Sequence, residues 1–167
     1  LNISKTLPKN TGTVIVKHAN PCGVSVNKNK IESYKEALSC DPISAFGGIV
    51  SCNFKVNKKI ALELSKIFLE VIIALGFDKV SLKILKKKKN LRLIDASKLK
   101  GDNLSNITSN FNSLLLQNVD NKIFSKDNFK VVSKIKPSKK IYNDLLFAFN
   151  VCRNVKSNAI VLTKNSS

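Results

Sequence analysis

The stretch TVIVKHANPCG, residues 13–23, decides the fold of this chain and marks a candidate site. Its apolar part, Thr13 to Val16, predicts a buried strand that ends in a turn. His18 is the one histidine of the sequence, and Lys17 stands directly before it. Because ligands of α/β proteins bind at the carboxyl ends of strands, this position favours a functional role. A lone histidine is also common as a structural or surface residue, so position alone leaves both interpretations open.

Length and charge narrow the class of protein. A chain of 167 residues, 43% of them hydrophobic and 24% charged, fits one globular domain with a sizeable core. The net charge of +18 comes mainly from lysine, because Arg92 and Arg153 are the only arginines. Direct reading of DNA relies on the bidentate guanidinium of arginine, so we expect no nucleic-acid partner. A biased genome also produces such a composition, and in either case the positive field favours phosphate or carboxylate ligands.

The cysteines and the hydropathy pattern indicate the cell compartment. No paired Cys-x-x-Cys spacing links the four cysteines, which are Cys22, Cys40, Cys52 and Cys152. The longest apolar stretch, residues 67–77, is too short to span a bilayer and carries Glu70. No secretory segment begins the chain. We therefore expect reduced thiols, a cytoplasmic protein and no membrane association.

Strand-like and helical patterns alternate along the chain. Besides residues 13–16, strands are predicted at residues 49–50, 70–74, 91–94, 114–116, 129–135 and 159–162. Helices are predicted at residues 31–40, 56–69 and 79–88, and a long helix is expected to open at Pro137. Turns or loops are predicted at residues 21–23, 41–48 and most of 95–112. This alternation predicts an α/β fold with a largely parallel or mixed sheet.

A zinc site is disfavoured by the residues around His18. The zinc deaminases combine His-x-Glu with a later Pro-Cys-x-x-Cys. Here Asn20 stands where the glutamate would be, and Ser25 stands where the second cysteine would fall. The ligand set is incomplete, so we expect no catalytic metal.

Five blocks carry a resemblance to a known family. They are VIVKHANPCG (residues 14–23), CDPISAFGGIV (40–50), EVIIA (70–74), KKNLRL (88–93) and KSNAIV (156–161). In this order and spacing they resemble the transformylase part of the bifunctional purine biosynthesis family, which joins AICAR transformylase to IMP cyclohydrolase. The resemblance covers nearly the whole chain. It implies a cytidine-deaminase-like, three-layer α/β fold with a mixed sheet and without catalytic zinc.

The resemblance also implies a reaction and its residues. Members transfer a formyl group from the co-substrate 10-formyltetrahydrofolate to the 5-amino group of AICAR, giving FAICAR, and the full-length family cyclises FAICAR to IMP. His18 would act as general base or proton relay. Lys17 would steady the oxyanion or protonate the leaving folate nitrogen, and Asn158 would orient histidine and substrate. Residues expected to bind substrate are Ile43, Phe46, Gly47 and Glu70.

Alternatives and departures remain. Glu70 could be a solvated carboxylate at a strand start, and Phe46 could be a core residue. Leu75 stands where the family usually has proline, and Asn112-Ser113 stands where it often has Gly-Gly. These changes leave the local backbone geometry open.

The resemblance further implies that the chain is incomplete. We expect residues 1–167 to be the first lobe of the transformylase domain, truncated at both ends and without the cyclohydrolase domain. Alone it would be inactive, and the full-length protein would form a homodimer. The alternative function is a non-catalytic basic module that binds RNA or other polyanions through lysines.

Overall fold

The computed structural model describes residues 2–99, 105–120 and 122–167. The sheet strands are β1 Gly12–Lys17, β2 Asn20–Val26, β3 Gly48–Cys52, β4 Leu69–Ala74 and β5 Arg92–Asp95. The α-helices are α1 Asn2–Thr6, α2 Lys30–Cys40, α3 Lys58–Leu64, α4 Lys79–Leu85 and α5 Lys139–Cys152. A hairpin of β6 Ser105–Asn110 and β7 Ser113–Asn118 and a 3₁₀-helix, η1 Lys126–Asn128, complete the described elements.

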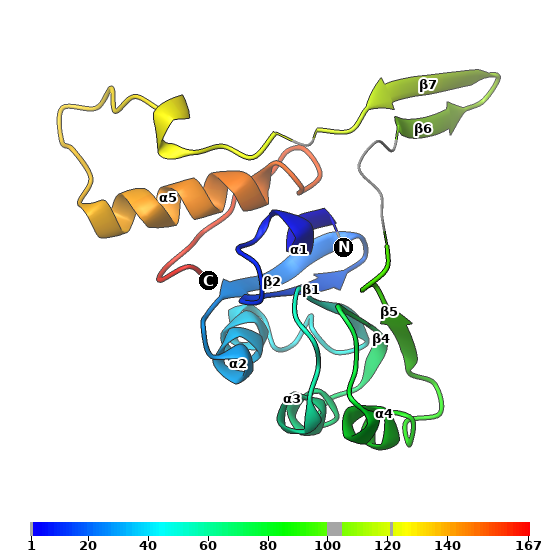
Figure 1. Cartoon of the computed structure of the whole chain (residues 1–167). Coiled ribbons are helices and arrows are strands. Elements are labelled where there is room, and N and C mark those ends of the chain that lie inside the picture. Colours follow the sequence, from blue (N-terminus) through cyan, green and yellow to red (C-terminus); the bar gives the residue numbers. More distant parts are fainter. Residues whose placement is uncertain (1, 100–104, 121) are drawn as a thin grey trace.

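Helices cover both faces of a five-stranded mixed sheet with the order β2-β1-β3-β4-β5. Helices α2, α3 and α4 lie on one face, and α1 and α5 lie on the other (Figure 1). Strands β3, β4 and β5 are parallel, as expected for strands joined by helices, while β1 is antiparallel to both β2 and β3. The predicted α/β fold with a mixed sheet is therefore confirmed.

The first hairpin differs from the prediction at one point. The turn expected at residues 21–23 is wrong, because these residues lie inside β2. The chain reverses instead at His18 and Ala19, with φ angles of 52° and 65°. Two consecutive positive φ angles give the backbone twist that suits a two-residue hairpin. Lys17 pairs with Asn20 across this turn, so His18 lies at the tip and Lys17 at its base.

Two buried clusters hold the sheet between its helices. On one face, Ile15, Val50 and Ile72 from neighbouring strands are fully buried against residues of α2, α3 and α4. On the other face, Val14 and Val24 pack with residues from both ends of the chain, which are Ile3, Leu7 and Val151. Successive residues of a strand point to opposite faces of the sheet, which explains why the strands supply side chains to both clusters. Burying each large aliphatic side chain contributes about 1.5–3 kcal/mol to stability.

Side-chain caps fix where the helices begin. Asn57 accepts a hydrogen bond from the backbone N–H of Ile60 at 3.2 Å, so α3 begins at Lys58. The helix predicted over residues 56–69 is shorter, because it ends at Leu64 and β4 starts at Leu69. Ser138 caps α5, which places Pro137 just before the cap instead of inside the helix.

The second half of the chain departs most from the predictions. β7 confirms the strand at residues 114–116, but its partner β6 lies within the segment 95–112 that was predicted as mostly loop; residues 100–104 lie outside the described residues. Residues 129–135 and 159–162 are not strands. Their apolar residues suit strands, but a strand needs a hydrogen-bonded partner. Such a partner is missing for both segments within the described part of the chain.

The helices of the described residues are also too short or too polar to cross a membrane.

Candidate functional site

Lys17 connects two segments that are distant in the sequence. Its Nζ donates hydrogen bonds to the carbonyl oxygens of Phe46 and Gly47, at 3.1 and 3.0 Å. Because β1 runs antiparallel to β3, the carboxyl end of β1 meets the amino ends of β3 and β4. The site thus combines the end of β1 with the loop before β3, and the carboxyl ends of the parallel strands lie at the opposite edge.

The loop from residue 41 to residue 48 is ordered by its own hydrogen bonds. The carboxylate of Asp41 accepts from the Ser44 backbone N–H at 2.9 Å and from its hydroxyl at 2.6 Å. The Asp41 carbonyl accepts from the Ala45 N–H, and the Ala45 carbonyl accepts from the Gly48 N–H. The hydrogen bonds from Ser44 hold the pKa of the Asp41 carboxyl below its usual value.

Gly47 and Gly48 allow close contacts at the end of the loop. Gly47 has a φ of 66°, and a Cβ there would lie 2.9 Å from the Lys17 ammonium nitrogen. A Cβ on Gly48 would meet the Ala45 carbonyl oxygen at 2.9 Å. The absence of a side chain at Gly47 therefore leaves room for the Lys17 ammonium, and its absence at Gly48 lets the loop fold tightly against the Ala45 carbonyl.

Two exposed aromatic rings lie beside this loop. Phe46 is 63% exposed, which excludes the core alternative, and its ring centroid lies 5.4 Å from that of Phe68. The Phe68 carbonyl accepts from the Gly47 N–H at 2.9 Å, so this residue is attached to the loop. Ile43, on the same loop, is 87% exposed. Sequence reasoning missed Phe68 because it placed this residue inside the predicted helix of residues 56–69. The available signal was its place two residues before the start of the EVIIA block.

Glu70 lies in β4 next to the loop but makes no contact with Lys17 among the described residues. Gly48 pairs with Leu69 and Ile49 with Val71, so Glu70 is left over at a register shift. Such irregularities re-aim side chains and occur next to active sites. The Glu70 side chain is exposed.

No hydrogen bond joins His18 and Asn158, both of which lie among the described residues. Both side chains are exposed, and His18 forms no side-chain hydrogen bond within the described residues. The segment of Asn158 does approach the hairpin, because the Lys156 N–H donates to the Asn20 side chain at 3.3 Å. The Asn158 side chain itself accepts from the Ser157 hydroxyl. Both residues therefore flank the same hairpin without forming a dyad.

Cys22 is the extra residue at a second register shift, between β1 and β2. Burial raises the pKa of its thiol, and the Asp41 carboxylate adds to this. All four cysteines are free. Across residues 2–99, 105–120 and 122–167, no group of three or more His, Cys, Asp or Glu side chains is placed to hold a metal ion.

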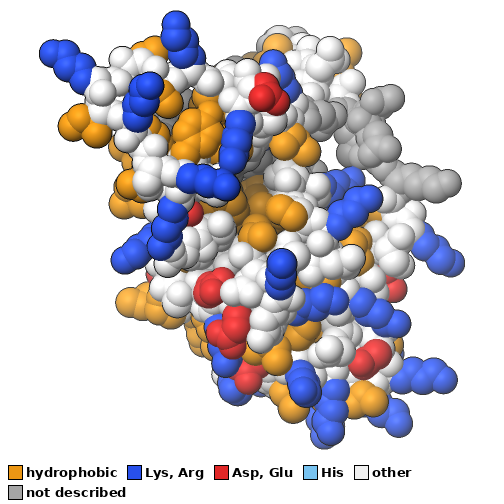
Figure 2. All heavy atoms as spheres, turned by 60° about the vertical axis from the view of Figure 1, so that its left-hand side comes forward, with side chains coloured by type: hydrophobic (Ala, Val, Ile, Leu, Met, Phe, Trp, Pro, Cys, Tyr) orange, Lys and Arg blue, Asp and Glu red, His pale blue; other side chains and the backbone are white. Residues whose placement is uncertain are grey.

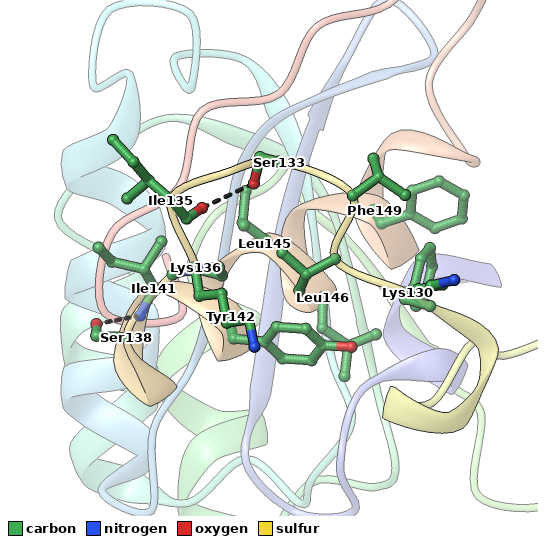
Figure 3. Close-up of a pocket in the computed structure, with 14 residues that line it drawn as sticks. Lys130, Ser133, Ile135, Lys136, Ser138, Ile141, Tyr142, Leu145, Leu146 and Phe149 are labelled. Atoms are coloured by element: carbon green, nitrogen blue, oxygen red, sulfur yellow. Dashed lines mark hydrogen bonds between the residues drawn. The ribbon is translucent and has the colours of Figure 1, made fainter.

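A separate cavity lies between α5 and the preceding segment. It has a volume of about 530 Å³ and shares no lining residue with the loop or with β4. The chain that carries Ser133 and Ile135 passes over Leu145 and Leu146 of α5 (Figure 3). The lining is mostly apolar, with Lys130 and Lys136 among its polar residues.

Comparisons with known proteins agree on one family. The family model described as AICARFT/IMPCHase bienzyme matches residues 1–167. The bifunctional purine biosynthesis protein PurH of Prochlorococcus marinus (strain MIT 9515) is 46% identical over 154 residues. PurH of Clostridium kluyveri is 46% identical over 152 residues. These matches cover 91% of this chain and 30% of each relative.

A third relative extends the comparison to another bacterium. PurH of Petrotoga mobilis is 42% identical over 159 residues, which are 95% of this chain and 31% of that protein. The chain therefore spans slightly less than a third of the length of these relatives.

Proposed function

Because the chain belongs to the AICARFT/IMPCHase bienzyme family, we propose that it contributes to formyl transfer from 10-formyltetrahydrofolate to AICAR, which gives FAICAR. The relatives are named as bifunctional purine biosynthesis proteins. The observation that carries the proposal is the Lys17 ammonium, held by two loop carbonyls beside exposed aromatic rings.

The chemistry requires three tasks at one place. The AICAR amine is a weak nucleophile, since its lone pair is delocalised into the ring. Its attack on the formyl carbon forms a C–N bond and an oxyanion; the bond to the folate nitrogen then breaks, and the amine proton ends on that nitrogen. We assign oxyanion stabilisation or protonation of the leaving nitrogen to Lys17, and proton removal to His18. Asn158 would orient the histidine and the substrate.

Substrate binding is assigned to the loop and to β4. The exposed ring of Phe46 offers a stacking surface for the imidazole of AICAR, with Ile43 beside it. Gly47 lets a ligand approach the backbone. The carboxylate of Glu70 can accept hydrogen bonds from the carboxamide or the amine.

Other parts of the proposal concern regions beyond this chain. Since the chain covers about 30% of the relatives, we propose that folate binding, homodimer formation and turnover need the remainder of such a protein. Residues 1–167 would then form the first lobe of a cytoplasmic transformylase, with the cytidine-deaminase-like classification that the three-layer arrangement supports. The complete protein would also cyclise FAICAR to IMP.

The alternative is a basic module that binds RNA or other polyanions. Its support is the net charge of +18. On the face drawn in Figure 2, however, basic side chains are scattered and acidic ones lie between them. A polyanion site needs cations gathered along one track. The specific contacts of Lys17 favour the transformylase proposal.

Calorimetric titration of AICAR into the chain tests the two functions. We expect saturable heat with AICAR and little with UMP. The variant Lys17→Ala loses a charged hydrogen-bonding group and should therefore bind AICAR about tenfold or more weakly. The matched control Lys58→Ala, which removes a lysine from α3, should bind AICAR as the unmodified chain does. Equal binding of AICAR, UMP and polyuridylate, with the same decline at high salt, would favour the polyanion module instead.

A further inference from the structure

Two Asp-x-x-Ser sequences that lie fully within the described residues, 41–44 and 78–81, differ in what they support. Asp41 accepts from the Ser44 N–H at 2.9 Å, and Asp78 accepts from the Ser81 N–H at 2.6 Å. Asp78 starts the helix α4. Asp41 follows α2 and starts a single turn that ends at Gly47. Asp41 therefore caps a turn beside the candidate site, whereas Asp78 makes the same kind of contact at the start of a helix away from it.

Hydrogen bonds at successive positions of the turn lie between Asp41 and Lys17. The Asp41 carboxylate holds both the N–H and the hydroxyl of Ser44. The turn then closes through the Phe46 N–H, which donates to the Ile43 carbonyl, and through the Gly48 N–H, which donates to the Ala45 carbonyl. This leaves the Phe46 and Gly47 carbonyls free to accept from the Lys17 ammonium.

The charges are placed to reinforce this geometry. The backbone dipoles of a helical turn favour a negative group at its amino end and a positive group at its carbonyl end. Asp41 occupies the first position and Lys17 the second.

We propose that Asp41 is a positioning residue that, through Ser44 and the turn of residues 42–47, fixes the Lys17 ammonium in place. Removal of the carboxylate frees the Ser44 N–H and hydroxyl, and the turn then opens. The Phe46 and Gly47 carbonyls leave Lys17, whose side chain becomes mobile. The relevance of this role to AICAR rests on the proposed function, but the mechanical link between Asp41 and Lys17 does not.

Competitive acylation of the lysines with acetic anhydride, read by mass spectrometry, tests the link without any ligand. The probe measures how accessible each amine is. We expect Lys17 to react about fivefold faster in Asp41→Ala than in the unmodified chain, as for loss of one net hydrogen bond. Ser44→Ala and Asp41→Asn should give smaller increases, because each keeps one of the two contacts.

Asp78→Ala is the matched control. It removes the same kind of cap from α4 and should leave the relative reactivity of Lys17 unchanged. If Asp41→Ala does not fold by circular dichroism, Ser44→Ala and Asp41→Asn decide the question. A Lys17 reactivity that changes no more in the Asp41 and Ser44 variants than in Asp78→Ala overturns the proposal.

A parallel AICAR titration separates this proposal from the proposed function. Binding that is lost in Lys17→Ala but fully kept in Asp41→Ala overturns the positioning role and leaves the function intact. Absence of AICAR binding in the unmodified chain contradicts the function, while the acylation rates still decide the role of Asp41.

Discussion

Residues 2–99 and residues 105–167 differ sharply in how their conformation is held. In the first region, side chains such as Ile15, Val50 and Ile72 are fully buried between two layers of helices. In the second region, every residue of β6 and β7 is exposed, and Val151 is the only buried residue among those described. A two-stranded hairpin is marginal by itself. The first region therefore has its own core. The second region needs contacts with the first region, or with further protein, to hold its conformation.

The same difference appears in the candidate site. Lys17, Phe46 and Gly47 belong to the region with a core, and hydrogen bonds join them. Asn158 belongs to the other region, and within the described part of the chain its side chain forms a hydrogen bond only with its neighbour Ser157. The hydrogen bonds that join site residues distant in sequence thus lie in the region with a core.

Thiol labelling should show the largest contrast. Burial raises the pKa of Cys52 to about 12, so its thiolate is scarce and shielded. We expect Ellman's reagent at pH 8 to label the exposed Cys40 in the native chain and Cys52 only on global unfolding. Cys152 should react at lower urea than Cys52. Simultaneous labelling of Cys52 and Cys152 along a urea series would mean that both regions unfold together.

Truncation of core side chains should give the next largest effect. Ile72→Ala removes a fully buried side chain and should lower the free energy of unfolding by about 2–5 kcal/mol. Leu115→Ala, in the exposed hairpin, should change it by less than about 0.5 kcal/mol. Urea denaturation followed by circular dichroism measures both. A large loss in Leu115→Ala would show that the hairpin packs against something in solution.

A smaller loss is expected from Gly23→Ala at the hairpin of the site. The new Cβ would lie 1.9 Å from the Ala37 carbonyl oxygen of α2, so the helix and β2 must separate. Overpacking of this kind costs about 1–3 kcal/mol. Ser113→Ala in the other hairpin is the control and should have no measurable effect. Equal urea midpoints for the two variants would contradict the close packing of α2 on β2.

Acid should weaken the first region gradually. The pKa values of Asp41, Glu63, Asp78 and Asp95 are lowered, mainly by hydrogen bonds to Ser44, Lys66, Ser81 and Ser97. A lowered folded-state pKa gives stability that is complete above the unfolded-state value, near 4, and is lost as the pH falls through the folded-state value. Urea midpoints should therefore decline as the pH falls below about 4. Asp78→Asn should make this decline shallower, and an unchanged slope would exclude its contribution.

Sequence patterns predicted the first region well and the second poorly. The expected elements form at residues 31–40, 49–50 and 70–74. In each of them, apolar side chains fall on the face that the neighbouring helices and strands bury. The runs at 129–135 and 159–162 have the composition of strands, but within the described residues no neighbouring strand forms hydrogen bonds with them. The extent of the helix at 56–69 was overestimated because periodicity continued past Leu64, whereas the chain had to turn toward β4.

The sequence by itself determined the α/β class, the family, and the order of strand, Lys17, His18 and glycine loop, because these depend on local pattern and residue identity. Only the tertiary structure decided that β1 runs antiparallel to β3, so that Lys17 meets the carbonyls of Phe46 and Gly47. It also decided that Phe68 joins the loop and that His18 and Asn158 stay apart. The physical reason is that such contacts join residues more than 20 positions apart, and the sheet order, which no local propensity encodes, brings them together.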